Sequence, residues 1–253
     1  MTYDAVINNG LWFDGTGAKP AVRNLGIRDG LVTAISLDPL DETDCPRVID
    51  ARRKWVIPGI VDIHTHYDVE ILEGPALSES LRHGVTSIFV GSCSLSTIHA
   101  SPPSDAGDLF GRVEAIPRKH VVDALNRAKT WNSASEYVAA LEALPLGPNV
   151  AAFIGHSDMR AAEMGLDRAT RKDVHPTDAE LASMEAQLTE ALDEDSSGCP
   201  VSNCCSTNST ARPAAHARCR RRMQPRKNDA DSMRSCAVGG DGYFRPDLTS
   251  PTR

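Results

Sequence analysis

The chain reads Ile57-Pro58-Gly59-Ile60-Val61-Asp62-Ile63-His64-Thr65-His66-Tyr67-Asp68 at the point that decides its fold. The apolar run within it is typical of a β-strand that is covered on both faces. The Pro-Gly pair fits the start of a strand, where a missing backbone donor does no harm. Side chains two positions apart on a strand point to the same face. We therefore expect His64 and His66 to converge on one metal ion at the end of this strand.

Two aspartates flank the His-x-His motif. Asp62 shares a strand face with His64, and Asp68 follows His66 closely. Carboxylates commonly accept a hydrogen bond from the second ring nitrogen of a histidine that binds a metal. Asp62 and Asp68 are therefore predicted to orient the two imidazoles. Without the apolar run and the trailing Asp68, the motif would indicate only two polar residues at a strand end.

These residues resemble the amidohydrolase superfamily, whose members carry metal ligands on a His-x-His motif after the first strand of a (β/α)8 barrel. A second stretch, Leu81-Arg82-His83-Gly84-Val85-Thr86-Ser87-Ile88-Phe89-Val90-Gly91-Ser92-Cys93, resembles the N-acyl-D-amino-acid deacylases, or D-aminoacylases. In that branch a cysteine after the second strand is a zinc ligand, and Cys93 stands in its place. The resemblance covers about Tyr3 to Glu194 and implies a zinc site of His64, His66 and Cys93.

The resemblance also implies an activity, which is hydrolysis of a small N-acyl-D-amino acid to a carboxylate and a D-amino acid. Zinc suits two imidazoles and a thiolate, and it lowers the pKa of bound water to about 7. The family takes two more histidines from strands five and six, and a proton-transferring aspartate after the last strand. None of these can be assigned in this sequence. The catalytic residues are therefore unknown, and the chain is expected to be inactive.

Several alternatives stay open. Cys93 could be a small buried apolar residue, or a nucleophile activated by His64 or His66. The chain could be a non-catalytic fragment that binds zinc weakly, or an amidohydrolase of another kind, such as a dihydropyrimidinase-like hydrolase of cyclic amides. His156 follows a predicted strand at residues 149–155, so it is expected either to line the substrate pocket or to be a structural histidine.

The order of patterns predicts an α/β protein in three parts. Residues 1–57 form a small β-sandwich module of short strands, with a turn at Asn9-Gly10. Residues 58–195 form the first three to four βα units of a partial (β/α)8 TIM-like barrel. The second and third barrel strands are expected at residues 85–90 and 149–155. The helices of this part are expected at residues 76–83, 108–116, 119–127, 135–144 and 177–194.

The composition limits the classes of partner. The chain has 253 residues, 41% of them hydrophobic, and a formal net charge of −7, which argues against binding to nucleic acid. No apolar run approaches the roughly 18 residues of a membrane span. The first residues lack the pattern of a signal peptide, so a cytoplasmic location is expected. The sequence does not decide the oligomeric state.

The composition changes near Asp195. Residues 1–195 carry 17 Lys and Arg against 30 Asp and Glu, whereas residues 196–253 carry 10 against 4. The second part also holds five of the seven cysteines and only three Val, Leu or Ile residues. Such a segment buries too little apolar surface to fold alone, so residues 196–253 are predicted to be disordered. Our hypothesis is that these residues arise from out-of-frame translation.

Overall fold

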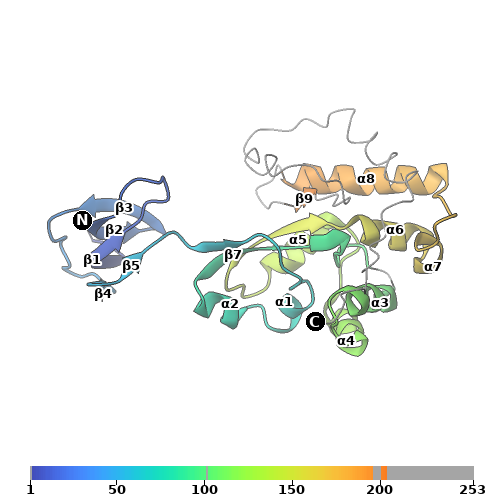
Figure 1. Ribbon diagram of the computed structural model, residues 1–253, viewed down its shortest axis with the longest axis horizontal. Helices are drawn as coiled ribbons and strands as arrows, with labels where there is room; N and C mark the ends of the chain where they lie inside the picture. The colour runs from blue at the N-terminus through green and yellow to red at the C-terminus, as the bar shows by residue number, and fades with distance from the viewer. Residues whose placement is uncertain (1, 101, 196–200, 204–253) are drawn as a thin grey trace, which may run out of the picture. The chain divides into compact units, whose positions relative to one another are not determined.

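The computed structural model describes residues 2–100, 102–195 and 201–203. It divides into two compact units, residues 1–60 and 61–253, so the division falls slightly after the predicted boundary at residue 57. Each unit has its own sheet (Figure 1). Among the described residues, none lies in a helix long and apolar enough to cross a membrane.

The first unit is a single β-sheet. Its strands pair in the order β3-β2-β1-β4, with β5 also paired to β1. Val6, Leu25 and Ala51 are its buried apolar residues. The described strands belong to one sheet, and the β-sandwich architecture of this module stays a prediction. The strands are β1 (Ala5–Trp12), β2 (Ala21–Arg28), β3 (Leu31–Ser36), β4 (Val48–Asp50) and β5 (Trp55–Val56).

The predicted turn at Asn9-Gly10 is wrong, because β1 continues through it to Trp12. The register with β2 shifts between Ile7 and Gly10, which marks a bulge instead of a turn. Asn9 has a left-handed backbone (φ 59°), and its amide donates to Asn24 Oδ1 at 2.9 Å. The positive φ that favours a turn at Asn9-Gly10 is thus accommodated by a bulge inside the paired strand.

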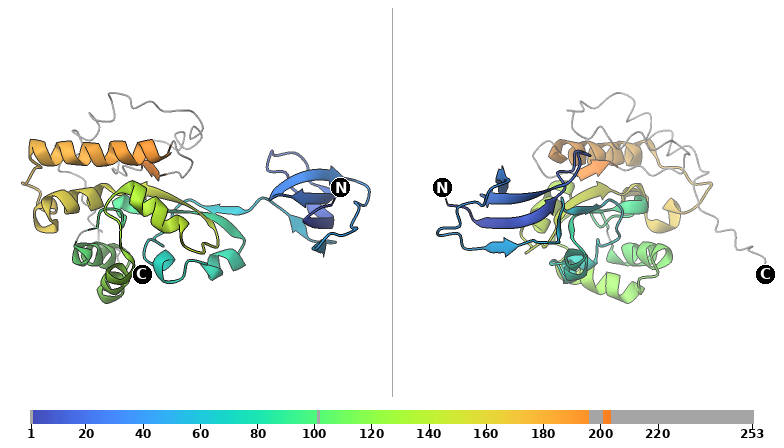
Figure 2. Two further views of the ribbon diagram at one scale, coloured as in Figure 1. Left: turned by 180° about the vertical axis from the view of Figure 1, so that it is seen from behind. Right: turned by 60° about the vertical axis from the view of Figure 1, so that its left-hand side comes forward.

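The second unit confirms the α/β class. Its sheet has the order β6-β7-β8-β9, and β7, β8 and β9 run parallel to one another. Helix α8 lies on one side of this sheet, and α3 and α4 lie on the other (Figures 1 and 2). Closure into a barrel stays a prediction. The strands are β6 (Ile60–Asp62), β7 (Val85–Val90), β8 (Asn149–Ile154) and β9 (Val201–Asn203).

The helices of this unit bury two apolar clusters. The larger cluster joins Ile88 and Val90 of β7 to Tyr137 of α5 and to Met184 and Leu188 of α8. The smaller lies between α3 and α4 and is centred on Phe110 and Val121. The helices are α1 (Glu70–Glu73), α2 (Ser78–Arg82), η1 (Ser92–Ser94), α3 (Pro103–Val113), α4 (Arg118–Ala128), α5 (Ala134–Glu142), α6 (His156–Met164), α7 (Leu166–Ala169) and α8 (Asp178–Asp195).

The sequence analysis expected the strand before the histidines to be covered on both faces, and this expectation is wrong. Ile60, Val61 and Ile63 are 46%, 50% and 62% exposed. The physical reason is that β6 is the edge strand of the four-stranded sheet, with β7 as its neighbour. The strand is also short and ends at Asp62, so His64 and His66 lie in the irregular segment that follows it.

Residues close in sequence cap several helices of this unit. The Ser133 hydroxyl accepts from the Glu136 amide at 3.3 Å and caps α5. Thr177 and Glu180 form the reciprocal bonds of a capping box before α8, at 3.3 and 2.8 Å. His83 is the C-terminal cap of α2. Helix α3 begins at Pro103, earlier than the predicted start at residue 108.

Residues 196–253 were predicted to be disordered, and most of them lie outside the described residues. The exception is β9, in which Val201, Ser202 and Asn203 pair with Ala152, Phe153 and Ile154 of β8. The sequence analysis found no strand in this part of the chain. That expectation is corrected for these three residues.

Candidate metal centre

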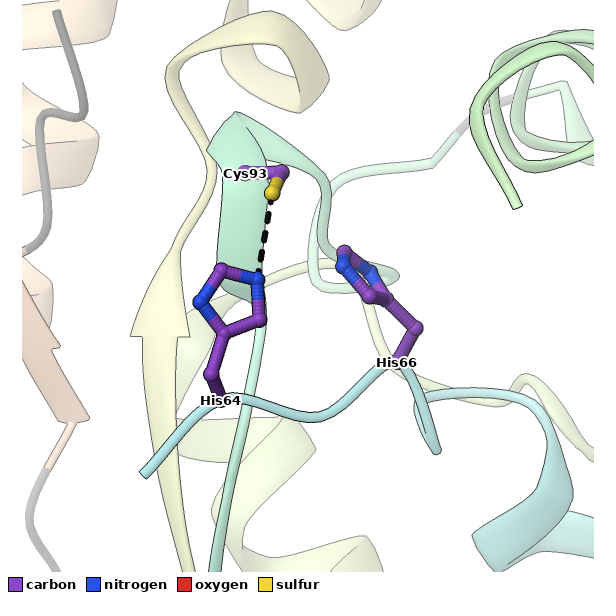
Figure 3. Close-up of side chains that lie close together, drawn as sticks. All are labelled: His64, His66 and Cys93. Carbon is purple, nitrogen blue, oxygen red and sulfur yellow. Dashed lines mark hydrogen bonds between the residues drawn. The ribbon is translucent and has the colours of Figure 1, made fainter. Parts of the chain in front are cut away.

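The two histidines are held by the residue between them. Thr65 is buried, and its amide and its hydroxyl both donate to the carbonyl oxygen of Phe89 in β7, at 3.1 and 2.7 Å. These two hydrogen bonds to the neighbouring strand fix the segment after β6. His64 and His66 project from it toward one space, with ring centroids 5.4 Å apart (Figure 3).

Cys93 reaches the same space from the end of β7. The chain turns sharply there, because Gly91 (φ 78°) and Cys93 (φ 55°) both have left-handed backbones. A Cβ at Gly91 would lie 2.1 Å from the carbonyl oxygen of Phe153 in β8, so only glycine fits. The turn places Cys93 Sγ 3.2 Å from His64 Nε2 (Figure 3).

The three predicted ligands therefore form one group. One donor atom from each of His64, His66 and Cys93 lies within 4.8 Å of the other two. Two donors bound to one zinc ion at about 2.0–2.3 Å in tetrahedral geometry lie about 3.3–3.8 Å apart, so the observed spread is close to that of a bound site. Two nitrogen donors and one sulfur donor are also the set that zinc prefers. The residues present fit a zinc ion.

The partial exposure of the group leaves it open to a ligand. His64 and Cys93 are exposed and His66 is half-buried. Burial, followed by the nearby His64, lowers the pKa of His66, whereas Glu114 raises it. Burial dominates these opposing effects, so His66 is held in the neutral form that a metal requires.

Glu114 is a carboxylate at this site that the sequence analysis did not find. It follows the last residue of α3, and its Oε1 lies 3.2 Å from His66 Nε2. The group of mutually close donors includes no carboxylate among the described residues, so Glu114 is a neighbour of the group. No pattern in the sequence could have found it, because the contact depends on how α3 packs against the rest of the unit.

The two aspartates predicted to orient the imidazoles make backbone contacts instead. Asp62 Oδ1 accepts from the His64 amide at 3.2 Å. Asp68 is fully buried, and its Oδ1 accepts from the Gly91 amide at 2.9 Å. Burial raises the pKa of Asp68 to about 7, although the bond from Gly91 opposes this rise. Orientation of an imidazole by either aspartate stays a prediction.

His156 lies apart from the donor group. As predicted, it follows a strand closely, and the structure shows in addition that it is the partly buried first residue of α6. Burial, together with the nearby Arg160, lowers the pKa of His156 to about 4. It is therefore neutral at physiological pH. A contact with substrate stays a prediction.

A second polar cluster, which we call the Asp158 clamp, joins the loop after β7 to α6. Asp158 Oδ2 accepts from the Ser96 hydroxyl at 2.5 Å and from the His99 amide at 2.9 Å. The Ser96 hydroxyl in turn accepts from the Gly155 amide at 3.1 Å. Asp158, Ser96 and His99 are all buried. The sequence analysis gave these residues no role, because nothing local shows that they meet.

Comparison with known proteins identifies homologues of this chain. No family model matches the chain. An uncharacterized protein of Mycobacterium tuberculosis is 57% identical over 193 residues, which is 76% of this chain and 31% of that protein. N-acyl-D-glutamate deacylase of Alcaligenes xylosoxydans xylosoxydans is 31% identical over 190 residues, which is 75% of this chain and 35% of that enzyme.

A solved structure agrees with these relatives. N-acyl-D-glutamate deacylase of Bordetella bronchiseptica, crystallised with zinc and a phosphonate mimic of the tetrahedral intermediate, matches with a TM-score of 0.61 and 32% identity. The match covers 76% of this chain and 37% of that enzyme. The chain is a homologue of the N-acyl-D-amino-acid deacylases of the amidohydrolase superfamily.

The deacylase homology covers only part of the relatives. The chain spans about a third of the length of each relative named above (31%, 35% and 37%). The three clustered donors lie within the part of the chain that the structure describes. What can be compared is therefore one region of a deacylase, and that region contains the candidate metal centre.

Proposed function

We propose that this chain carries the metal-binding region of a zinc-dependent deacylase that hydrolyses the linear amide bond of an N-acyl-D-amino acid. The observation that supports it is the convergence of one donor atom each from His64, His66 and Cys93 within 4.8 Å. The relatives named as N-acyl-D-glutamate, N-acyl-D-aspartate and D-amino-acid deacylases support the class of substrate.

Each residue has a separate part in this proposal. His64, His66 and Cys93 would hold the ion, and Thr65 fixes the segment that presents the two histidines. When bound, zinc supplies a Lewis acid that polarises the amide carbonyl and lowers the pKa of water. The half-buried His66 stays neutral at pH 7, because burial lowers its pKa. Substrate recognition by His156 belongs to this proposal as well.

We also propose that the 253-residue polypeptide binds zinc without catalysing the reaction. Deacylation needs a carboxylate to move a proton, which is typically worth about 10² to 10⁴ in rate. The buried carboxylates of the described part, Asp68 and Asp158, are bonded to backbone amides. The later histidines and the aspartate that the resemblance implies are not assigned to any residue of this sequence. We interpret residues 196–253 as an out-of-frame replacement of the segment that would supply them.

The test compares the chain as printed with a chain whose reading frame is restored after Asp195. With zinc supplied, the printed chain should release no D-amino acid from N-acetyl-D-glutamate or N-acetyl-D-methionine. The restored chain should release it, and His66→Ala in the restored chain should abolish the release. His83→Ala is the matched control, because His83 caps α2 outside the donor group.

Three outcomes would contradict the proposal. Zinc-dependent turnover by the printed chain would show that its own residues complete the site, and Glu114 beside His66 would then be the first carboxylate to test. Turnover of a cyclic amide but of no N-acyl-D-amino acid by the restored chain would favour a dihydropyrimidinase-like hydrolase. Failure of both chains to bind zinc would favour a non-catalytic fragment without a metal site.

A further inference from the structure

Asp68 links the two segments that carry the candidate ligands. It lies in the segment of His64 and His66, and its Oδ1 accepts a hydrogen bond of 2.9 Å from the amide of Gly91. Gly91 lies two residues before Cys93, in the turn after β7. Asp68 is fully buried, with 0% of its surface exposed. The bond therefore joins the histidine segment to the cysteine turn inside the protein.

The cysteine turn needs such an anchor. Gly91, Cys93 and Ser94 have φ angles of 78°, 55° and 69°. For residues other than glycine the left-handed conformation costs roughly 1–2 kcal/mol each. The bond from the Leu95 amide to the Ser92 carbonyl closes the turn itself. The bond from Gly91 to Asp68 ties it to the histidine segment.

The use of a carboxylate at this position is costly. Burial of an ionisable group is unfavourable unless hydrogen bonds compensate it. Asp68 Oδ1 has the Gly91 amide as a partner, whereas Oδ2 is buried with no hydrogen-bond partner among the described residues. A group that is only half satisfied stabilises the fold poorly. Its value lies in the position that it imposes on Gly91 and, through the turn, on Cys93.

We propose that Asp68 is a positioning residue of the metal centre, which holds the Cys93 thiol within reach of the ion bound by His64 and His66 through its bond to the Gly91 amide. This inference rests on the proposed metal-binding function. It differs from the expected role of Asp68 as an orienter of an imidazole, because the structure directs its hydrogen bond to the cysteine turn.

The experiment uses the 253-residue protein with Asp68→Asn and Asp68→Ala. Asparagine keeps an oxygen that can accept the Gly91 amide, and alanine does not. Zinc affinity is measured by competition with a chromophoric chelator, and Co²⁺ is added to measure the thiolate-to-cobalt absorption that reports Cys93. Asp158→Asn is the matched control, because Asp158 is also buried and its bonds run to Ser96 and His99, which are not candidate ligands.

Asp68→Ala should weaken zinc binding by about tenfold to a hundredfold, the usual effect of losing a residue that supports a ligand. It should also reduce the thiolate-to-cobalt absorption and speed hydrogen exchange of the Gly91 amide. Asp68→Asn should keep the absorption and bind zinc within about threefold of wild type. Asp158→Asn should behave as wild type. This rescue by asparagine separates the hydrogen bond from the negative charge.

Two results would overturn the inference. One is a folded Asp68→Ala protein with wild-type absorption and affinity, and the other is an Asp68→Asn protein that loses both. If Asp68→Ala does not fold, the asparagine variant and the Gly91 exchange rate still decide. His66→Ala and Cys93→Ala are measured in parallel. If they bind zinc as wild type does, the proposed metal centre itself fails. If they lose zinc while Asp68→Ala keeps it, only the role of Asp68 fails.

Discussion

The second unit has two polar clusters near the ends of β7 and β8, and they differ in how their polar atoms are satisfied. In the metal centre, donor atoms of His64, His66 and Cys93 face one another at the surface. In the Asp158 clamp, a buried carboxylate oxygen accepts two hydrogen bonds from Ser96 and His99. The clamp has the features of a structural cluster, and the metal centre has those of a ligand site. Burial and the hydrogen bonds accepted by Asp158 separate the two clusters, although both contain the residue types of an active site.

The largest expected effect that tests this comparison is loss of metal affinity at the first cluster. Cys93→Ala should lower zinc affinity by about a hundredfold or more, because a thiolate ligand is lost. The free energy of unfolding of the metal-free protein should change by less than about 1 kcal/mol, since Cys93 is exposed and alanine bears the same left-handed backbone cost. Elemental analysis and urea denaturation measure the two quantities. Equal zinc content in the variant and the wild type would exclude Cys93 as a ligand.

The second effect should fall on stability and leave metal affinity nearly unchanged. Asp158→Ala removes the acceptor of the Ser96 hydroxyl and of the His99 amide, and each buried donor left without a partner costs about 1–3 kcal/mol. The free energy of unfolding of the metal-free protein should therefore fall by about 2–4 kcal/mol in urea denaturation. Zinc affinity of the folded protein should change little. Substitution of the exposed Asp173 by alanine is the control, and a loss below about 1 kcal/mol at Asp158 would show that the clamp is not structural.

The smallest effect is a pH dependence that distinguishes the clamp from its neighbour His156. Burial raises the pKa of Asp158 to about 6, against the effect of its bonds to Ser96 and His99. Between pH 4 and 6 the folded state then holds more protons than the unfolded state, so Asp158 makes stability fall as pH rises. His156, with a pKa lowered to about 4, makes stability rise between pH 4 and 6.5.

Asp158→Asn should therefore make the free energy of unfolding rise more steeply with pH over this window, by at most about 1.4 kcal/mol per pH unit. His156→Gln should flatten the same curve. Urea denaturation at several pH values between 4 and 6.5 gives both slopes. An unchanged slope in Asp158→Asn would mean that this carboxyl group is not desolvated in solution.

The three candidate ligands could be picked out from sequence because each stands near the end of a recognisable strand pattern. His64 and His66 follow an apolar run, and Cys93 follows the strand at residues 85–90, which the structure shows as β7 with the same bounds. The caps of α5 and α8 are also local features, because each joins residues three positions apart in the sequence.

The remaining parts depend on tertiary packing that no local pattern records. Glu114 meets His66 only because the end of α3 packs beside the histidine segment. The bond from Gly91 to Asp68 and the Asp158 clamp likewise join distant segments. The exposure of β6 was missed because an apolar run does not show whether a strand is at the edge of its sheet. Helix α6 was missed because its first turn carries no capping side chain.

The close approach of two glycines to neighbouring backbone has a consequence for how this site should vary through evolution. A Cβ at Gly91 would lie 2.1 Å from the Phe153 carbonyl oxygen, and a Cβ at Gly155 would lie 2.5 Å from that of Ser94. Neither glycine offers a ligand or a proton, yet a larger residue at either position would force apart the segments that carry the candidate ligands. Selection on metal binding should therefore act as strongly on these two positions as on the candidate ligands themselves.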